Sequence, residues 1–258
     1  MRIFVISLTS AATRRENARR QMDALGIDFE FYDAIPACEI DRLKPFEACR
    51  ESEWVLNTGR EVTPGEIACF ASHRAMWQRC VDLDEPVVIM EDDFFLMDGF
   101  DDALQQLATN VEELGFIRLQ TETRARAKFL RKSGDFTLSR YLKAPHSMMC
   151  YGVSPGAAKK LIAGSGCVDA PVDVYVKRFW VHGQLLFGLA PYTVTESDLS
   201  SNTDICGRVK CNKSLLVRTR RSLHRLADWV RRQRFNVAVD QVTDDRKHVR
   251  PASAPAAR

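Results

Sequence analysis

Short apolar runs and amphipathic stretches alternate along the first 190 residues of this chain. Apolar runs rich in β-branched and aromatic residues predict strands at residues 2–8, 29–34, 87–90, 116–119 and 147–153. Apolar residues at helical spacing predict helices at residues 13–25, 63–81, 100–114 and 154–162. Strands that are joined by helices favour an α/β fold with a mostly parallel central sheet flanked by helices.

Three of the predicted helices begin with a capping pattern. Thr13 is followed three residues later by Glu16, which is the capping-box spacing. Thr63 and Ser154 each precede a proline, which is favoured at the first position of a helix. Gly26 predicts the end of the first helix.

Two segments break the alternation. Residues 35–62 carry scattered charges, prolines and a glycine, so we expect a loop-rich insertion or short helices there. Residues 121–140 are polar and basic, which predicts a mobile loop or a hairpin, and such a loop is a candidate lid over an acceptor site.

The end of the chain predicts a basic amphipathic helix over residues 215–234. Its apolar face is made of Leu216, Leu223, Leu226, Ala227, Trp229 and Val230. Residues 208–234 hold ten Lys or Arg and one acidic residue, whereas the net charge of the whole chain is only +3. Such a helix suits an anionic membrane surface, and the alternatives are docking on the body with a solvated basic face or contact with nucleic acid.

Length and composition fit an ordinary globular protein. The 258 residues, of which 45% are hydrophobic, predict one domain over residues 1–205, the basic tail over 206–235 and a disordered end over 236–258. No apolar run is long enough for a membrane span, and the first residues lack the core of a signal peptide. We therefore expect a cytoplasmic protein whose eight scattered cysteines are reduced.

Three consecutive acids, Glu91, Asp92 and Asp93, end the apolar run at residues 87–90. If the strand stays extended, Glu91 and Asp93 point to one side and Asp92 to the other. Carboxylates at the carboxyl edge of a sheet favour Mg²⁺ or Mn²⁺, which commonly bridge to substrate phosphates. The alternative is a strand that ends in a solvated acidic turn.

Several motifs stand in an order that resembles glycosyltransferase family 25, the bacterial lipooligosaccharide galactosyltransferase-like proteins. The matching segments cover about residues 2–200. They are Ser7-Leu8 with Thr13-Arg14-Arg15, Phe31-Tyr32-Asp33-Ala34, Gly65-Glu66-Ile67-Ala68-Cys69 with Ser72-His73 and Trp77, Ile89-Met90-Glu91-Asp92-Asp93, Tyr151-Gly152-Val153-Ser154 with residues 156–161, and Pro171-Val172-Asp173.

The resemblance implies a GT-A-like nucleotide-sugar fold, a divalent metal, a UDP-sugar donor (most often UDP-galactose) and transfer to a glycan with inversion. It implies that Asp93 and Glu91 hold Mn²⁺ or Mg²⁺. The implied donor site contains Ser7, Leu8, Arg14, Arg15, Ser72, His73, Glu91 and Asp92. Both arginines have surface charges as their alternative, and a lone histidine such as His73 is more often structural.

Inversion requires a base that takes the proton of the acceptor hydroxyl. Asp173 matches the family's Pro-x-Asp position, and Asp169 is the second candidate. The alternative for Asp173 is a turn or cap residue after a proline. Two positions depart from the family pattern, which usually has Asn in place of Ser7 and Gln in place of Glu196.

The expected partners are a nucleotide-sugar donor, a lipid-linked surface glycan such as lipooligosaccharide, and the inner-membrane surface, bound through residues 213–234, but not nucleic acid. The expected location is the cytoplasmic face of the inner membrane. A metal-dependent phosphohydrolase or nucleotidyltransferase would also use clustered carboxylates. A non-enzymatic membrane-surface protein, in which the acids are structural, is a third reading.

Overall fold

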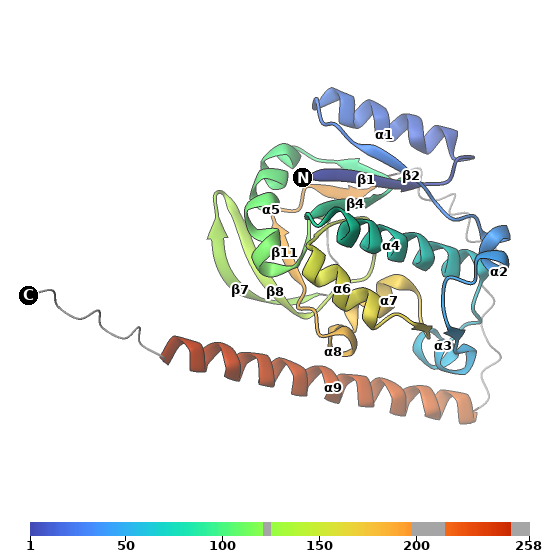
Figure 1. Cartoon of the computed structure of the whole chain (residues 1–258). Coiled ribbons are helices and arrows are strands. Elements are labelled where there is room, and N and C mark those ends of the chain that lie inside the picture. The colour runs from blue at the N-terminus through green and yellow to red at the C-terminus, as the bar shows by residue number, and fades with distance from the viewer. Residues whose placement is uncertain (121–124, 198–214, 249–258) are drawn as a thin grey trace, which may run out of the picture.

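The computed structural model describes residues 1–120, 125–197 and 215–248, and its centre is an eight-stranded sheet (Figure 1). From one edge to the other, the strands are β2 (Glu30–Asp33), β1 (Arg2–Ser7), β4 (Val87–Glu91), β9 (Cys150–Val153), β6 (Phe116–Arg118), β11 (Phe187–Ala190), β8 (Phe136–Lys143) and β7 (Arg126–Ser133). Two small sheets pair β3 (Ala48–Cys49) with β10 (Cys167–Val168) and β5 (Phe94–Leu96) with β12 (Val194–Glu196).

Helices cover both faces of the central sheet. One face packs against α1 (Ala12–Ala24) and α5 (Phe100–Leu114), and the other against α4 (Pro64–Leu83) and α6 (Pro155–Ala163). The apolar run of β4 is continuous because both faces of this strand are buried. Val88 and Met90 pack in the core on the side of α1 and α5, whereas Val87 and Ile89 pack in the core on the side of α4 and α6. The predicted α/β class with flanking helices is confirmed.

The sheet is mixed: six of its eight strands run in one direction, as a mostly parallel sheet would have, but only three of its seven strand pairings are parallel. Strand β1 is parallel to β2 and β4, and β6 is parallel to β11. Strand β9 is antiparallel to both β4 and β6, and β8 is antiparallel to both β11 and β7. The chain returns from the β7–β8 hairpin to the edge where β4 ends, as the 2.9 Å hydrogen bond from Glu91 N to Met149 O shows. Strand β9 therefore runs back across the sheet.

The two irregular segments have regular structure. Residues 35–62 contain η1 (Ala37–Glu39), α2 (Ile40–Leu43), β3 and α3 (Glu51–Thr58), as the short-helix alternative predicted. Within 121–140, the hairpin alternative is confirmed from residue 126 onward, and residues 121–124 lie outside the described residues. Because β7 and β8 are paired strands of the central sheet, residues 126–140 do not form the expected loop-like lid.

Two of the three capping predictions are confirmed. The Thr63 hydroxyl accepts from Glu66 N at 3.3 Å, and the Ser154 hydroxyl accepts from Ala157 N at 3.4 Å. The capping box at Thr13 is wrong, because α1 begins at Ala12 and its first residue is preceded by Ala11 without a side-chain cap. A threonine inside the first turn no longer occupies the capping position.

Three further helices complete the described fold: α7 (Val172–Lys177), α8 (Phe179–His182) and α9 (Leu215–His248). Helix α9 packs along the body against α3, α8 and β8, on the side away from α1 (Figure 1). It is longer than the sequence indicated, since residues 236–248 continue the helix instead of being disordered, and residues 249–258 lie outside the described residues. Among the described residues, no helix combines the length and apolar composition of a membrane span.

Candidate active site

A cleft of about 500 Å³ lies where β1 and β4 end. The first half of α4, the start of α7 and the loop at residues 147–149 form further parts of its wall, together with Arg14 of α1 and the segment that follows β2. This is the edge at which open α/β sheets bind ligands. Ten residues that the sequence singled out line it: Ser7, Leu8, Arg14, Ser72, His73, Glu91, Asp92, Asp93, Asp173 and Glu196.

The three consecutive acids all line the cleft, but they lie in different backbone settings. Strand β4 ends at Glu91, and Asp92 and Asp93 form a turn that leads into β5. The expectation of an extended strand through Asp93 is therefore wrong. The turn is held because the main-chain carbonyl of Asp93 accepts from Ser197 N at 2.9 Å, next to the β5–β12 pair.

Asp92 is bound to the end of β1. The Ser7 hydroxyl donates to its Oδ2 at 2.5 Å, and Arg14 Nε lies 3.4 Å from its Oδ1. Burial raises the pKa of Asp92, while the Ser7 hydrogen bond and the Arg14 charge act in the opposite direction. The structure thus brings Ser7, Arg14 and Asp92 together as one brace at the cleft.

Asp93 has the oxygen environment of a hard cation site. Its Oδ1 is buried, and among the described residues no donor bonds to it. Burial, followed by the Glu91 and Asp92 charges, raises the pKa of Asp93 to about 7, and Glu196 acts in the same direction. Crowded, desolvated carboxylates with an unpaired oxygen fit Mg²⁺ or Mn²⁺, which are oxygen-binding ions.

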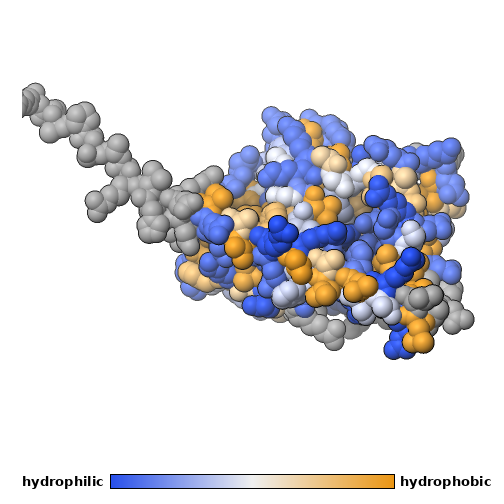
Figure 2. Space-filling view, turned by 90° about the horizontal axis from the view of Figure 1, so that it is seen from below, coloured by the Kyte–Doolittle hydropathy of each residue, from blue (hydrophilic) through white to orange (hydrophobic). Residues whose placement is uncertain are grey.

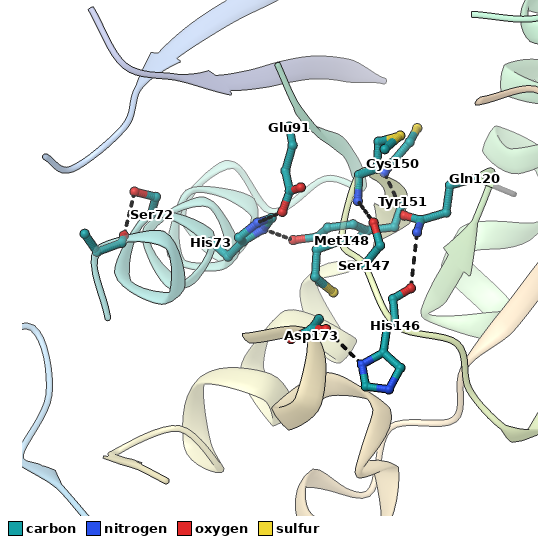
Figure 3. Close-up of polar contacts among 12 residues, drawn as sticks. Ser72, His73, Glu91, Gln120, His146, Ser147, Met148, Cys150, Tyr151 and Asp173 are labelled. Atoms are coloured by element: carbon teal, nitrogen blue, oxygen red, sulfur yellow. Dashed lines mark hydrogen bonds and ion pairs between the residues drawn. The ribbon is translucent and has the colours of Figure 1, made fainter. Parts of the chain in front are cut away.

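Glu91 is held from its buried side by a chain of aromatic groups (Figure 3). Its Oε1 lies 3.1 Å from His73 Nε2, and His73 Nδ1 lies 3.0 Å from the Tyr151 hydroxyl. The Tyr151 oxygen accepts the Trp77 N–H at 2.9 Å, which leaves its own proton for His73 Nδ1. The Nε2 proton of His73 then points at Glu91 and fixes one of its two oxygens.

A second group of possible metal ligands includes a sulfur and a nitrogen atom. The ligand atoms of Cys69, His73 and Glu91 all lie within 4.8 Å of one another. A thiol must lose its proton to bind a metal, and burial and then the Glu91 charge raise the pKa of Cys69 well above its usual value. The oxygen atoms around Asp93 are therefore the better fit for a divalent ion.

Two of the predicted donor-site residues have other partners. Arg15 does not line the cleft: it donates to the Ser7 carbonyl at 2.8 Å and lies 4.8 Å from the centre of the Phe31 ring. Ser72 lines the cleft, but its hydroxyl accepts from Ile35 N at 2.9 Å. Both residues position backbone at the cleft.

Asp173 lies across the cleft in the first turn of α7 and accepts from His146 Nδ1 at 3.0 Å (Figure 3). Lys177 Nζ lies 2.8 Å from His146 Nε2. Burial would raise the pKa of Asp173, but the His146 hydrogen bond and the nearby positive charges lower it overall. Asp169 is not part of the cleft wall and forms an ion pair with Arg178 at 2.9 Å.

Three basic residues near this acid were not predicted from the sequence: Lys177, His146 and Arg118. His146 has no local pattern that links it to Asp173, 27 residues away. Arg118 is fully buried, and its guanidinium donates to the main-chain carbonyls of His146 and Ser147. A charged residue inside the apolar run at 116–119 was the available signal for Arg118.

Comparison with known proteins identifies the family to which the chain belongs. A sequence model of glycosyltransferase family 25, described as LPS biosynthesis proteins, matches residues 1–176. The chain belongs to glycosyltransferase family 25. The match covers every cleft residue except Glu196.

Named relatives of family 25 agree with this membership. The chain is 38% identical over 106 residues to lipooligosaccharide biosynthesis protein lic2B of Haemophilus influenzae, covering 40% of this chain and 37% of that protein. It is 33% identical over 127 residues to the lacto-N-neotetraose biosynthesis glycosyltransferase LgtB of Neisseria meningitidis serogroup A, covering 47% of this chain and 44% of that protein. The aligned part of the chain spans less than half the length of these relatives.

Proposed function

We propose that this protein is a metal-dependent, inverting glycosyltransferase with a GT-A-like fold, which moves galactose from UDP-galactose to a lipid-linked surface glycan such as lipooligosaccharide. One observation carries the proposal: the ionised Asp173 lines the same cleft as Asp93, whose buried Oδ1 has no hydrogen-bond donor among the described residues. An electrophilic donor and a deprotonating base can therefore meet in one cavity. The family description and the names of the relatives support the acceptor class.

Asp93 and Glu91 would hold Mn²⁺ or Mg²⁺, which supplies charge neutralisation for a departing diphosphate. Asp93 offers the unpaired Oδ1, and Glu91 offers the oxygen that His73 does not bind. Glu196 lies close enough to raise the pKa of Asp93, so it adds negative charge to this corner. The departure from the family's usual Gln at that position strengthens the attraction for a cation.

The donor nucleotide would lie against the end of β1. Ser7, Leu8 and Arg14 face the cleft there, with Arg14 already ion-paired to Asp92. We assign Arg15 and Ser72 to holding the backbone around the nucleotide, because both have main-chain partners. His73 acts through Glu91, which it orients.

Asp173 is the proposed base. The acceptor hydroxyl gives its proton to Asp173, its oxygen forms the new bond to the anomeric carbon, and the bond from that carbon to the UDP oxygen breaks on the opposite face. His146 and Lys177 keep Asp173 ionised, so it is ready to accept the proton at neutral pH. Asp169 is unsuited to this role because it is paired with Arg178.

The lipid-linked acceptor places the protein on the cytoplasmic face of the inner membrane. This location is part of the proposal.

The first test is release of UDP from a panel of UDP-sugars, with and without Mn²⁺, which needs no known acceptor. We expect metal-dependent hydrolysis of UDP-galactose that Asp93→Asn abolishes and Asp98→Asn leaves unchanged, since Asp98 is exposed and outside the cleft. Preference for another sugar would replace galactose and keep the class. If hydrolysis is absent and calorimetry also finds no metal-dependent UDP binding, the transferase proposal fails. Release of phosphate instead of UDP would favour a phosphohydrolase.

A further inference from the structure

Helix α9 docks on the body through a polar seam. Asp228 pairs with Arg178 at 3.5 Å, and Asn236 Nδ2 donates to the Leu142 carbonyl at 3.0 Å. Asp240 pairs with Arg140 at 2.8 Å. These contacts tie α9 to α8 and β8 and fix which side of the helix faces outward.

An aromatic contact extends the same seam. The ring of Phe235 lies 5.5 Å from that of Phe179, and Arg221 donates to the Leu56 carbonyl at 3.4 Å. Arg221, Asp228 and Phe235 recur every seven residues, so they share one side of the helix. That side is the one in contact with the body.

The apolar stripe of α9 faces away from the body. It consists of Leu223, Leu226, Trp229, Val230 and Val237, which are 62%, 56%, 50%, 39% and 56% exposed. Leu223, Val230 and Val237 each follow a seam residue by two positions, which is a rotation of about 200° around an α-helix. Figure 2, seen from the side of α9, shows apolar residues among strongly hydrophilic ones on this face.

Arginines border the stripe on both sides. At about 100° per residue, Arg220, Arg231 and Arg234 lie along one edge, and Arg218 and Arg225 along the other. All five are exposed. Asp228 is the one acid between residues 215 and 239, and it is turned to the body in its ion pair with Arg178. The outward face of α9 therefore combines apolar side chains with positive charge and no carboxylate in that range.

We infer that α9 is a membrane-docking helix that lies flat on anionic phospholipid, with its apolar stripe in the acyl boundary and its arginines on the head groups. Charge complementarity selects this occupant: arginines on both edges would repel those of a second copy, whereas anionic lipid attracts all of them. Trp229 has the amphipathic character favoured at the membrane interface. Residues 215–239 rise about 37 Å along the helix axis, so they offer an extended contact.

The inference deepens the proposed function. It rests on that function in one respect: a lipid-linked acceptor is the reason why the enzyme would bind a membrane surface. The docking itself depends on α9 alone. It also orients the body, since α9 runs along the side away from α1 (Figure 1).

The test is co-sedimentation of the full chain with vesicles of phosphatidylcholine containing 30% phosphatidylglycerol. We expect binding that falls at least tenfold when phosphatidylglycerol is omitted, and that weakens in high salt. The pair Arg225→Gln with Arg231→Gln should weaken it about 25-fold, given about fivefold for each arginine lost. Binding that is equal on neutral vesicles would overturn the charge argument.

The stripe has its own matched variants. Leu226→Ser removes an exposed leucine of the stripe, and Leu25→Ser removes one that is 45% exposed at the end of α1. We expect vesicle binding to drop severalfold in the first and to stay unchanged in the second. Both side chains are exposed, so circular dichroism should show a native fold in each variant.

Trp229 supplies a spectroscopic reading. Its fluorescence should shift to shorter wavelength on vesicle addition, and Trp229→Phe should remove the shift. Absence of vesicle binding overturns the inference. Self-association that Leu226→Ser abolishes, or binding of a duplex oligonucleotide that depends on Arg225 but not on Leu226, would then assign the face to a second copy or to nucleic acid. Intact UDP-sugar hydrolysis in these variants would leave the proposed function standing.

Discussion

The Ser7 hydroxyl and Asp92 Oδ2 lie 2.5 Å apart, although 85 residues separate them in the chain. The contact joins the last residue of β1 to the turn after β4, so the end of the first strand and the acidic corner are one unit. Arg14 closes the unit from α1. The position of Asp93 in the cleft follows from how this turn is held.

Ser7→Ala should loosen this corner. Loss of a hydrogen bond to a buried carboxylate reduces the free energy of unfolding by about 1 to 3 kcal/mol. The hydrogen bond from Ser7 also lowers the pKa of Asp92, so this pKa should rise in the variant. We expect lower stability in urea unfolding and weaker UDP binding by calorimetry. Ser10→Ala, at an exposed position after β1, is the control and should change neither. Unchanged UDP affinity in Ser7→Ala would show that the contact between Ser7 and Asp92 does not contribute to donor binding.

His146→Ala should change the pH dependence of transfer. Asp173 acts as a base only when ionised, so the rate falls as pH drops through its pKa. The His146 hydrogen bond and charge lower that pKa, and their removal raises it. The acidic limb of the kcat/KM profile should therefore move to higher pH in His146→Ala. His146→Gln keeps a donor, so its limb should lie between the two. A profile that does not move would exclude Asp173 as the titrating base.

The elements that form the core could be predicted from the sequence better than the contacts in the candidate site. The continuous apolar run of β4 predicts a strand covered on both faces, and α4 and α5 cover them as periodicity indicated. The direction of β9 was unpredictable locally, because it depends on where the β7–β8 hairpin returns the chain. The sequence identified the three acids, but the turn at Asp92 and Asp93 depends on a hydrogen bond from Ser197 N, which lies about a hundred residues further along the chain.

Helix α9 illustrates the same limit. Its periodicity correctly placed Leu223, Leu226 and Val230 on one face, and a sequence argument would dock that face on the body. The structure instead turns the polar side toward the body, because Asp228 pairs with Arg178 just before α8 and Asn236 donates to the Leu142 carbonyl in β8. Such a choice depends on residues far away in the chain, which no local pattern reveals. The Asp173–His146 pair was missed for the same reason.

Mn²⁺ should raise the melting temperature of the native protein but not that of Asp93→Asn. The crowded carboxylates oppose folding when no cation is present, so we expect Asp93→Asn without metal to melt at least as high as the native protein. Saturating Mn²⁺ at about 100 times its dissociation constant adds about 2.7 kcal/mol to the native protein. For a chain of this size, each kcal/mol raises the melting temperature by about 2 to 4 °C. Scanning calorimetry should show this rise in the native protein and in Asp98→Asn, but not in Asp93→Asn.

His182 should make the fold sensitive to acid. Its Nε2 donates to the Val176 carbonyl at 2.9 Å and its Nδ1 accepts from Gln184 N at 3.2 Å, so both nitrogens are committed to the neutral ring. Burial lowers the pKa of His182 from 6.5 to about 4. The unfolded chain then binds the proton first as pH falls, so this stabilisation is complete above pH 6.5 and decreases toward pH 4. The loss by pH 4 is about 3 kcal/mol.

His182→Gln isolates this contribution, since its amide can also donate and accept but does not titrate. Urea unfolding at pH 7 and pH 4 should show a loss of stability that is about 3 kcal/mol smaller in the variant than in the native protein. An equal loss in the variant and the native protein would mean that the acid sensitivity arises elsewhere, because a buried neutral imidazole is the one group that the His182 substitution removes.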